Sequence, residues 1–454
     1  MSDARASHSP GSPSLVSPSL VSKGRTFIYG FGLLPIAALA LPLSILLPPL
    51  YAETFGLGVA TVGLVFTLAR LWDFVTDLAM GWAIDRFPSR WGRRKHWVVL
   101  SLPLLMLGGW QLYLPPAFSS HWAGVLHLSI WLFVLYVGFT LLLITHYAWG
   151  AELTSSTGER AKLYGARDMF LIGGILLCLI GPAVVEGLYG ASQAAQVGMV
   201  GLFLLVLLPV AVGLLVWRLP DDARAPAPRA PFRRGFALAR DDALFRMPLY
   251  LDFLTGLGQG VTAAVFVFAA THAYALPGRS SLLLLGYFVA GLAAMPLWIW
   301  AARRFGAERA YSWACLWIAL VALGYLAVPP GSLVLLAVVV VANGLAIGPP
   351  FFVTRTLMAD AIDRSERDGV AIRSLGFAML NMSNKISGAL AVGIAFACLA
   401  LFGFDTGSEG ADVDDTARTG LRLVFGIGPA LCYGAAFLVL RRMMTLQRAE
   451  RTEL

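Results

Sequence analysis

The sequence predicts an all-α membrane protein with twelve transmembrane helices arranged as two pseudo-symmetric six-helix bundles. Three observations predict it: a low content of charged residues, twelve long apolar segments and an internal repeat. Of the 454 residues, 58% are hydrophobic and 13% are charged. A soluble protein carries about a quarter of charged residues to cover its surface. We therefore expect lipid to cover most of the exterior.

Twelve apolar runs are long enough to cross the hydrocarbon core of a bilayer. They lie at about 26–51, 57–84, 97–115, 122–150, 168–190, 194–217, 245–274, 281–301, 310–328, 332–358, 376–402 and 419–440. Most Lys and Arg residues lie in alternate loops, at 85–96, 153–167, 218–243, 302–309 and 361–373, and in the tail. Because cytoplasmic loops carry the positive charge, both termini are expected in the cytoplasm. The net charge of +8 thus reflects orientation in the membrane, and no nucleic-acid partner is expected.

The longest basic loop divides the chain into halves. The predicted units are a disordered cytoplasmic tail at 1–25, an N-terminal bundle at 26–217, a cytoplasmic central loop at 218–244, a C-terminal bundle at 245–440 and a second cytoplasmic tail at 441–454. The segment from Glu152 to Arg167 is echoed by Asp360 to Arg373, with offsets of 208 and 206 residues. Two bundles related by a pseudo-two-fold axis along the membrane normal produce such a repeat, with substrate bound between them.

Charged residues inside the second apolar segment need a reason, because a charge at the centre of a span costs about 3 kcal/mol. At 100° per residue, Arg70, Asp73, Asp77 and Gly81 lie on one stripe of a helix. Two carboxylates one turn apart form a site of hard oxygen ligands for Na⁺ or a proton, and Thr76 could add a hydroxyl. The alternative is that Arg70 simply neutralises one acid as a structural ion pair, but one Arg cannot balance two carboxylates.

Lys385 lies deep in the eleventh segment, and a facing carboxylate is its expected partner. Asp73 and Asp77 are the obvious candidates, and the alternative is an interhelical pair without a transport role. Four other ionisable residues are also expected in the membrane region: His146, Asp252, His272 and Arg355. Asp252 is expected to be interfacial, whereas Arg355 is expected to pair with Asp360 or to line the cavity.

A set of charged residues at the ends of the basic loops is a candidate cytoplasmic gate, in which ion pairs between bundles close one side of the transporter. Its members are Asp85, Arg90, Arg93, Arg94, Glu152, Arg160, Arg167, Asp360, Arg367 and Arg373. The alternative is that these charges serve orientation alone.

The second segment and the loop after it resemble the signature of the glycoside–pentoside–hexuronide:cation symporters, the melibiose permease-like family of the major facilitator superfamily. The matching residues are Arg70, Trp72, Asp73, Asp77 and Gly81, then Asp85-Arg86 and Ser89-Arg90-Trp91-Gly92-Arg93-Arg94. Ala151-Glu152-Leu153-Thr154, Ala359-Asp360 with Asp363, and Lys385 resemble later parts of the family's pattern. The resemblance covers essentially the whole chain and implies the major facilitator fold.

The resemblance also implies roles for residues. Asp73 and Asp77 become the cation carboxylates, Thr76 and Thr140 further ligands, and Lys385 a coupling residue facing them. Arg70, one turn before Asp73, is the second expected coupling residue. The sugar permeases of the family carry acids where this chain has Ala37 and Leu143. The coupling residues are therefore retained while the acids that hold sugar hydroxyls are missing. The sodium-coupled lysolipid symporters of animals share the same acids of the second span.

The predicted function is a cation-coupled symporter of the inner membrane, using Na⁺ or H⁺, for a sugar or glycoside. The alternatives are a cation-coupled carrier of an amphipathic, lysolipid-like solute and a non-transporting receptor or scaffold on a transporter fold. No nucleophile elbow or Walker loop predicts an enzyme. The four cysteines lie far apart in apolar stretches, so neither a disulfide framework nor a metal site beyond Na⁺ is expected. We expect a monomer in the bilayer without an organic cofactor.

Overall fold

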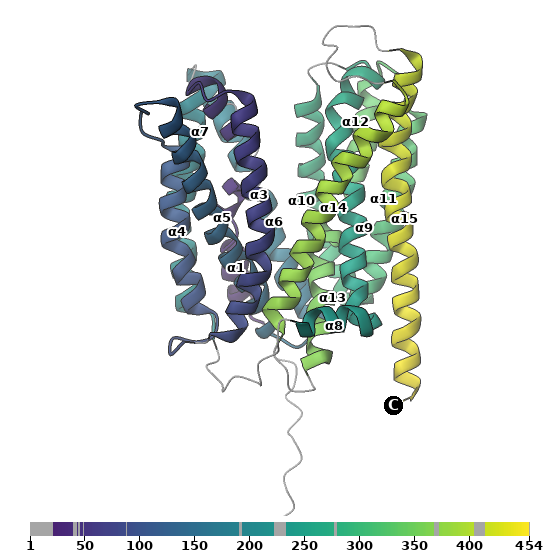
Figure 1. The fold of residues 1–454 in the computed structure, drawn as a ribbon. Coiled ribbons are helices and arrows are strands. Elements are labelled where there is room, and N and C mark those ends of the chain that lie inside the picture. Colours follow the sequence, from purple (N-terminus) through teal and green to yellow (C-terminus); the bar gives the residue numbers. More distant parts are fainter. Residues whose placement is uncertain are drawn as a thin grey trace, which may run out of the picture.

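The computed structural model describes residues 21–39, 43, 46–48, 50–87, 89–189, 193–221, 233–276, 279–366, 372–403 and 414–453. Within these ranges the chain forms two groups of long helices that lie side by side, one purple to blue and the other teal to yellow (Figure 1). Residues 1–20 of the predicted tail at 1–25, residues 222–232 of the predicted central loop and Arg367 lie outside the described residues.

The N-terminal group follows the first six apolar segments. The first contains α1 (Lys23–Phe31), a 3₁₀ turn (Pro35–Leu39) and a π-helical turn (Leu50–Thr54). The others are long helices: α3 (Val59–Arg86), α4 (Lys95–Tyr113), α5 (His121–Glu152), α6 (Thr157–Tyr189) and α7 (Gln193–Arg218). Helix α6 begins eleven residues before its predicted span, which started at 168, because Glu159 lies in its first turn, where the helix dipole favours an acid.

The C-terminal group begins after a short helix, α8 (Arg233–Asp241), within the predicted central loop. Its elements are α9 (Ala243–Phe268) with a π-helical turn (Ala269–Ala273), α10 (Ser280–Phe305), α11 (Ala307–Gly324) with a 3₁₀ turn (Tyr325–Ala327), α12 (Leu333–Gly344), α13 (Gly348–Glu366), α14 (Arg373–Leu401) and α15 (Asp415–Glu453). Helix α15 continues through the predicted tail from 441, because that stretch is rich in good helix formers.

Among the described residues, nine helical segments are long and apolar enough to cross a membrane by length and composition. Helices α12 and α13 count as one of these segments, with a break after Gly344. The break follows the sequence, because Pro349 and Pro350 lack amide hydrogens and therefore fit only the first turn of α13. Indole nitrogens from two neighbouring helices bind the carbonyls freed there, Trp298 to Leu345 and Trp317 to Ala342.

The two groups meet through a small set of helices. Helix α3 packs on α14, and α6 packs on α10 and α13. Gly81 of α3 permits the first contact, since a Cβ there would lie 2.5 Å from the Cβ of Ala378. Gly165 of α6 permits the second, with Ile299 side-chain atoms 2.4 Å from such a Cβ. The predicted acids of α3 are thereby placed against the other bundle.

Candidate functional site

Asp73 and Asp77 of α3 face Lys385 of α14 across the boundary between the bundles. The Lys385 Nζ lies 2.5 Å from Asp73 Oδ2 and 2.7 Å from Asp77 Oδ2. On the other side, the hydroxyl of Thr140 on α5 lies 2.7 Å from Asp73 Oδ1 and 2.9 Å from Asp77 Oδ1. Both acids are buried, with 4% and 1% of their surface exposed. The two carboxylates, one helical turn apart, thus both contact Lys385 and Thr140.

Among the described side chains, this site holds one ammonium for two carboxylates, so one negative charge is left over when both acids are ionised. Three oxygen-bearing side chains converge there, the donor set that a hard monovalent cation prefers. Thr76 is also buried, but its hydroxyl donates to the Asp73 backbone carbonyl at 3.0 Å. Its contribution is thus to the helix, whereas Thr140 contacts both acids. The Arg70 side chain lies outside the described residues.

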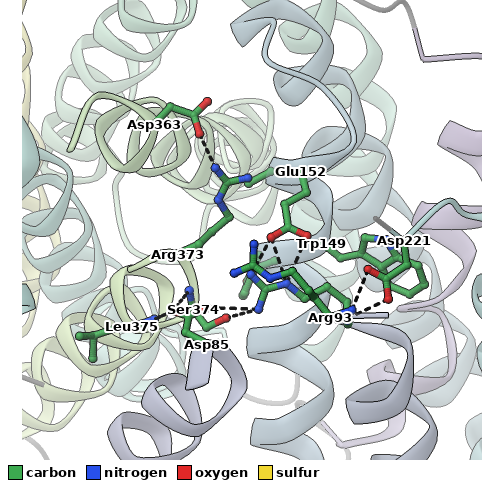
Figure 2. A network of polar contacts seen from close by, with 12 residues as sticks. Asp85, Arg93, Trp149, Glu152, Asp221, Asp363, Arg373, Ser374 and Leu375 are labelled. Carbon is green, nitrogen blue, oxygen red and sulfur yellow. Dashed lines mark hydrogen bonds and ion pairs between the residues drawn. The ribbon is translucent and has the colours of Figure 1, made fainter. Parts of the chain in front are cut away.

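A second group of charges joins the bundles at the end where the basic loops lie (Figure 2). Arg94 is fully buried and contacts Glu152 at 2.7 Å and Asp85 at 3.3 Å. It also donates to the Ser374 hydroxyl of α14 at 2.6 Å. Burial lowers the pKa of Arg94, but the carboxylates of Glu152 and Asp85 outweigh it and raise that pKa above its usual value. Arg94 therefore stays charged.

Asp85 completes this contact by binding the start of α14. Its Oδ2 accepts the backbone amides of Ser374 at 2.7 Å and Leu375 at 3.1 Å. Amides in the first turn of a helix have no intrahelical partner, and the helix dipole favours a negative charge beside them. The end of α3 is thus tied to the beginning of α14.

Arg160 of α6 forms a second set of ion pairs between the bundles. Its guanidinium binds Asp360 at 2.6 Å and also Asp363, both on α13. The hydroxyl of Thr157 donates to Asp360 at 2.7 Å, and Arg373 holds Asp363 at 2.7 Å. The structure thus brings Arg160, Asp360 and Arg373 of the predicted gate together.

Glu159, the neighbour of Arg160, forms a bridge that the sequence did not assign. It contacts Arg303 of α10 at 2.9 Å and Lys162 at 3.2 Å, and it accepts the backbone amide of Val21 at 3.1 Å. Its position in the first turn of α6 was the available signal, since acids favour that position.

Three predicted gate residues have a different position or a different kind of contact from the one expected. Arg90 is exposed. Arg93 offers its backbone amide to Asp221 at 3.2 Å, together with the amides of Arg94 and Lys95 at 2.9 Å (Figure 2). Arg167 does not join the gate, because it lies two helical turns beyond Arg160 and further inside the bundle.

Arg167 belongs instead to a buried cluster between the bundles. It pairs with Asp168, and its guanidinium carbon lies 4.1 Å from the centre of the Tyr147 ring. From the other bundle, Arg355 donates to the Tyr147 hydroxyl at 3.3 Å and pairs with Asp252 at 3.3 Å. We call these five residues the axial cluster.

The axial cluster corrects two expectations. Asp252 is not interfacial: it is 2% exposed, because nine residues of α9 precede it and carry it about 13 Å along the helix. Arg355 does not pair with Asp360, which binds Arg160 instead. Five residues along a helix turn a side chain about 140° away, so Arg355 and Asp360 point in different directions.

Comparisons with known proteins show the family of the chain. The chain matches the model of the MFS/sugar transport protein family over residues 28–447, and it belongs to that family. It is 22% identical over 409 residues to the inner membrane symporter YicJ of Escherichia coli (strain K12), covering 87% of this chain and 86% of that protein. It is 24% identical over 407 residues to the sphingosine-1-phosphate transporter MFSD2B of Xenopus tropicalis, covering 81% and 77% of the two chains.

Solved structures show the same fold. A bacterial homologue of the iron transporter ferroportin, in its outward-facing state, matches with a TM-score of 0.68 and 14% identity, covering 93% of this chain and 99% of that chain. The predicted major facilitator fold is confirmed, and the chain is a multi-pass membrane transporter, not an enzyme. Similarity to named symporters also supports cation-coupled solute transport.

Proposed function

We propose that Asp73, Asp77 and Thr140 bind the coupling cation, Na⁺ or H⁺, and that Lys385 occupies their carboxylates when the cation is absent. The observation that carries the proposal is the 2.5 Å and 2.7 Å contacts of one ammonium with two acids of the opposite bundle. A structural ion pair would leave the charges matched, whereas the described side chains of this site leave one buried negative charge uncompensated. Such a charge is costly unless a cation joins it.

The cation acts by competing with Lys385. When it enters, the acids are neutralised by a mobile ion, and the attraction that holds α14 to α3 weakens. Helix α14 also carries Ser374 in the contact with Arg94, so one rigid element connects the cation site with the opposite end of the interface. A cation that binds the two conformations unequally shifts the balance between them.

We place the gate and both termini in the cytoplasm, with the protein in the inner membrane. The basic loops support this orientation, since positive loops remain on the cytoplasmic side, and one relative is an inner membrane symporter. In this orientation the ion pairs of Arg94, Arg160 and Glu159 close the cytoplasmic side. One chain supplies both bundles, and it works as a monomer.

The solute is a sugar or glycoside in the first proposal, supported by the family's description. A specific observation favours an amphipathic, lysolipid-like solute as the second. Ala37 is fully buried, and Leu143 is apolar and packs against the hydrophobic core, so neither position offers a polar group to a sugar. A relative that transports sphingosine-1-phosphate is compatible with this alternative. A non-transporting receptor is disfavoured, because it would not need the costly Asp73 and Asp77.

The test is uptake into proteoliposomes driven by an imposed Na⁺ or H⁺ gradient, with radiolabelled glycosides and lysolipids as separate arms. Asp73→Asn and Asp77→Asn should each abolish concentrative uptake while leaving folded protein in the membrane. Asp415→Asn is the matched control, because Asp415 is an exposed acid at the start of α15. Full gradient-driven uptake by both α3 variants would overturn the assignment.

A further inference from the structure

The axial cluster lies on the pseudo-two-fold axis. The offset of 208 residues that relates Glu152 to Asp360 also relates Tyr147 to Arg355. These two equivalent residues contact each other, with 3.3 Å between Arg355 Nε and the Tyr147 hydroxyl. Two positions exchanged by a two-fold axis can touch only beside that axis. A solute that crosses between the bundles therefore has to pass this point.

The cluster has no net charge, yet its charges are incompletely paired. Arg167 and Arg355 supply two cations, and Asp168 and Asp252 supply two anions, with none more than 6% exposed. Arg355 reaches Asp252 through a single 3.3 Å contact instead of a bidentate pair. Within the part of the chain that the structure describes, the Nε of Arg167 and the Oδ2 of Asp168 are buried without a hydrogen-bond partner.

Incomplete pairing is costly in a purely structural network. Buried polar groups in proteins are nearly always hydrogen-bonded, and a buried ion pair is tolerated when its remaining donors and acceptors are satisfied. A guanidinium has five N–H donors in a planar fork that suits carboxylate or phosphate oxygens. The cluster therefore has an unused hydrogen-bond donor on an arginine and an unused hydrogen-bond acceptor on an aspartate.

We propose that the axial cluster recognises a dipolar solute, one that carries an anionic and a cationic group together. The anionic group binds Arg167 and Arg355, and the cationic group binds Asp168 and Asp252. Tyr147, whose ring centre lies 4.1 Å from the guanidinium carbon of Arg167 and 5.5 Å from that of Arg355, orients the solute. A dipolar solute preserves the neutrality of the buried cluster, whereas a solute with one charge leaves an uncompensated charge there. This inference rests on the proposed function and narrows its substrate class.

The dipolar group can belong to a free solute or to the headgroup of a lysolipid, and the probes separate these sources. The free set is phosphocholine, choline and methyl glucoside. The lipid set is lysophosphatidylcholine, lysophosphatidic acid and monoacylglycerol. Thermal stabilisation of the purified full chain is measured against the concentration of each probe. We expect the dipolar member of at least one set to reach half-saturation at a concentration about tenfold lower than its neutral and singly charged analogues.

Substitutions in the axial cluster test whether its residues cause the preference for dipolar probes. Asp252→Asn combined with Arg355→Gln removes both charges while keeping the side chains similar in size, an exchange that buried ion pairs often tolerate. This double variant should lose the tenfold preference. Tyr147→Phe, which removes only the hydroxyl, should reduce it about threefold and serves if the double variant does not fold. Arg240→Gln is the matched control, because Arg240 is an exposed arginine of α8 paired with Asp241.

Two outcomes overturn the inference: stabilisation by methyl glucoside or monoacylglycerol at least equal to that by the dipolar probes, and a preference that survives in both cluster variants. Failure of the proposed function is recognised separately. In that case Na⁺ and pH affect the wild-type chain and Asp77→Asn equally, whatever the charge preference of the probes.

Discussion

Two of the ionic regions between the bundles, the gate and the cation site, differ in charge balance. At the gate end of the interface, the ion pairs among the described residues join five cations to five carboxylates: Arg94, Arg160, Lys162, Arg303 and Arg373 with Asp85, Glu152, Glu159, Asp360 and Asp363. At the cation site, one ammonium serves two carboxylates. A matched set holds two surfaces together, whereas an unmatched one has a place for a mobile cation.

Because their charge balance differs, the gate and the cation site respond to different events. Breaking the gate requires separating paired charges, so a ligand elsewhere has to supply that energy. The cation site responds directly to an ion, because the ion and Lys385 compete for the same oxygens. Both regions meet on α14, which begins at the gate with Ser374 and carries Lys385 about 16 Å further along.

Lys385→Ala should give the largest change at the cation site, since it removes the internal competitor. The two acids then have no ammonium, and the purified chain should bind Na⁺ with a half-saturating concentration about tenfold lower than the wild type, a gain of about 1.4 kcal/mol. Thermal stability measured against Na⁺ concentration and pH tests this. If Lys385 has only a packing role, the variant melts earlier at every Na⁺ concentration and keeps the wild-type ion profile.

Arg160→Gln should open the gate without changing the cation site. Loss of the charged contacts with Asp360 and Asp363 costs about 2 kcal/mol, which shifts a two-state equilibrium roughly 30-fold. Spin labels at Ser155 and Arg304, both exposed and in different bundles, should show a longer distance in the variant. Arg240→Gln should leave the distance distribution unchanged. An unaltered distribution in Arg160→Gln would mean that the matched charges do not hold this end closed.

Gly92→Ala should have the smallest effect, confined to the loop beside the gate. Gly92 has φ +120°, and a Cβ there would lie 2.0 Å from Asp221 Oδ2, which accepts the amides at the start of α4. Loss of this cap costs about 1 kcal/mol, so the melting temperature should fall a few degrees while Na⁺ dependence persists. Gly63→Ala, where nothing lies within 4 Å, is the control. A change in Na⁺ dependence would contradict the separation of the two regions.

The sequence predicted features that depend on spacing along one helix. Apolar runs of span length predicted the transmembrane fold, and helical periodicity put Asp73 and Asp77 on one stripe. The facing position of Lys385 was predicted from charge alone, since a buried ammonium needs a carboxylate.

Contacts between helices far apart in the sequence were predicted less well. Arg167 was assigned to the gate because of its loop, but the helix already begins at Thr157 and carries it inward. Asp168 and Tyr147 were missed, because neither stands out in a single sequence. The repeat could have found Tyr147, since its offset to Arg355 equals that of Glu152 to Asp360.

The most direct test of the cation site is a zero-length crosslink. An apolar carbodiimide activates a buried carboxyl, and the Lys385 amine then displaces the urea to form an amide with Asp73 or Asp77. Mass spectrometry of the digested protein identifies the joined α3 and α14 peptides. We predict that this crosslink forms in Na⁺-free buffer, and that its yield falls as Na⁺ or, for a proton-coupled carrier, acid displaces the ammonium. An absent crosslink, or a yield that neither Na⁺ nor pH alters, would contradict the account.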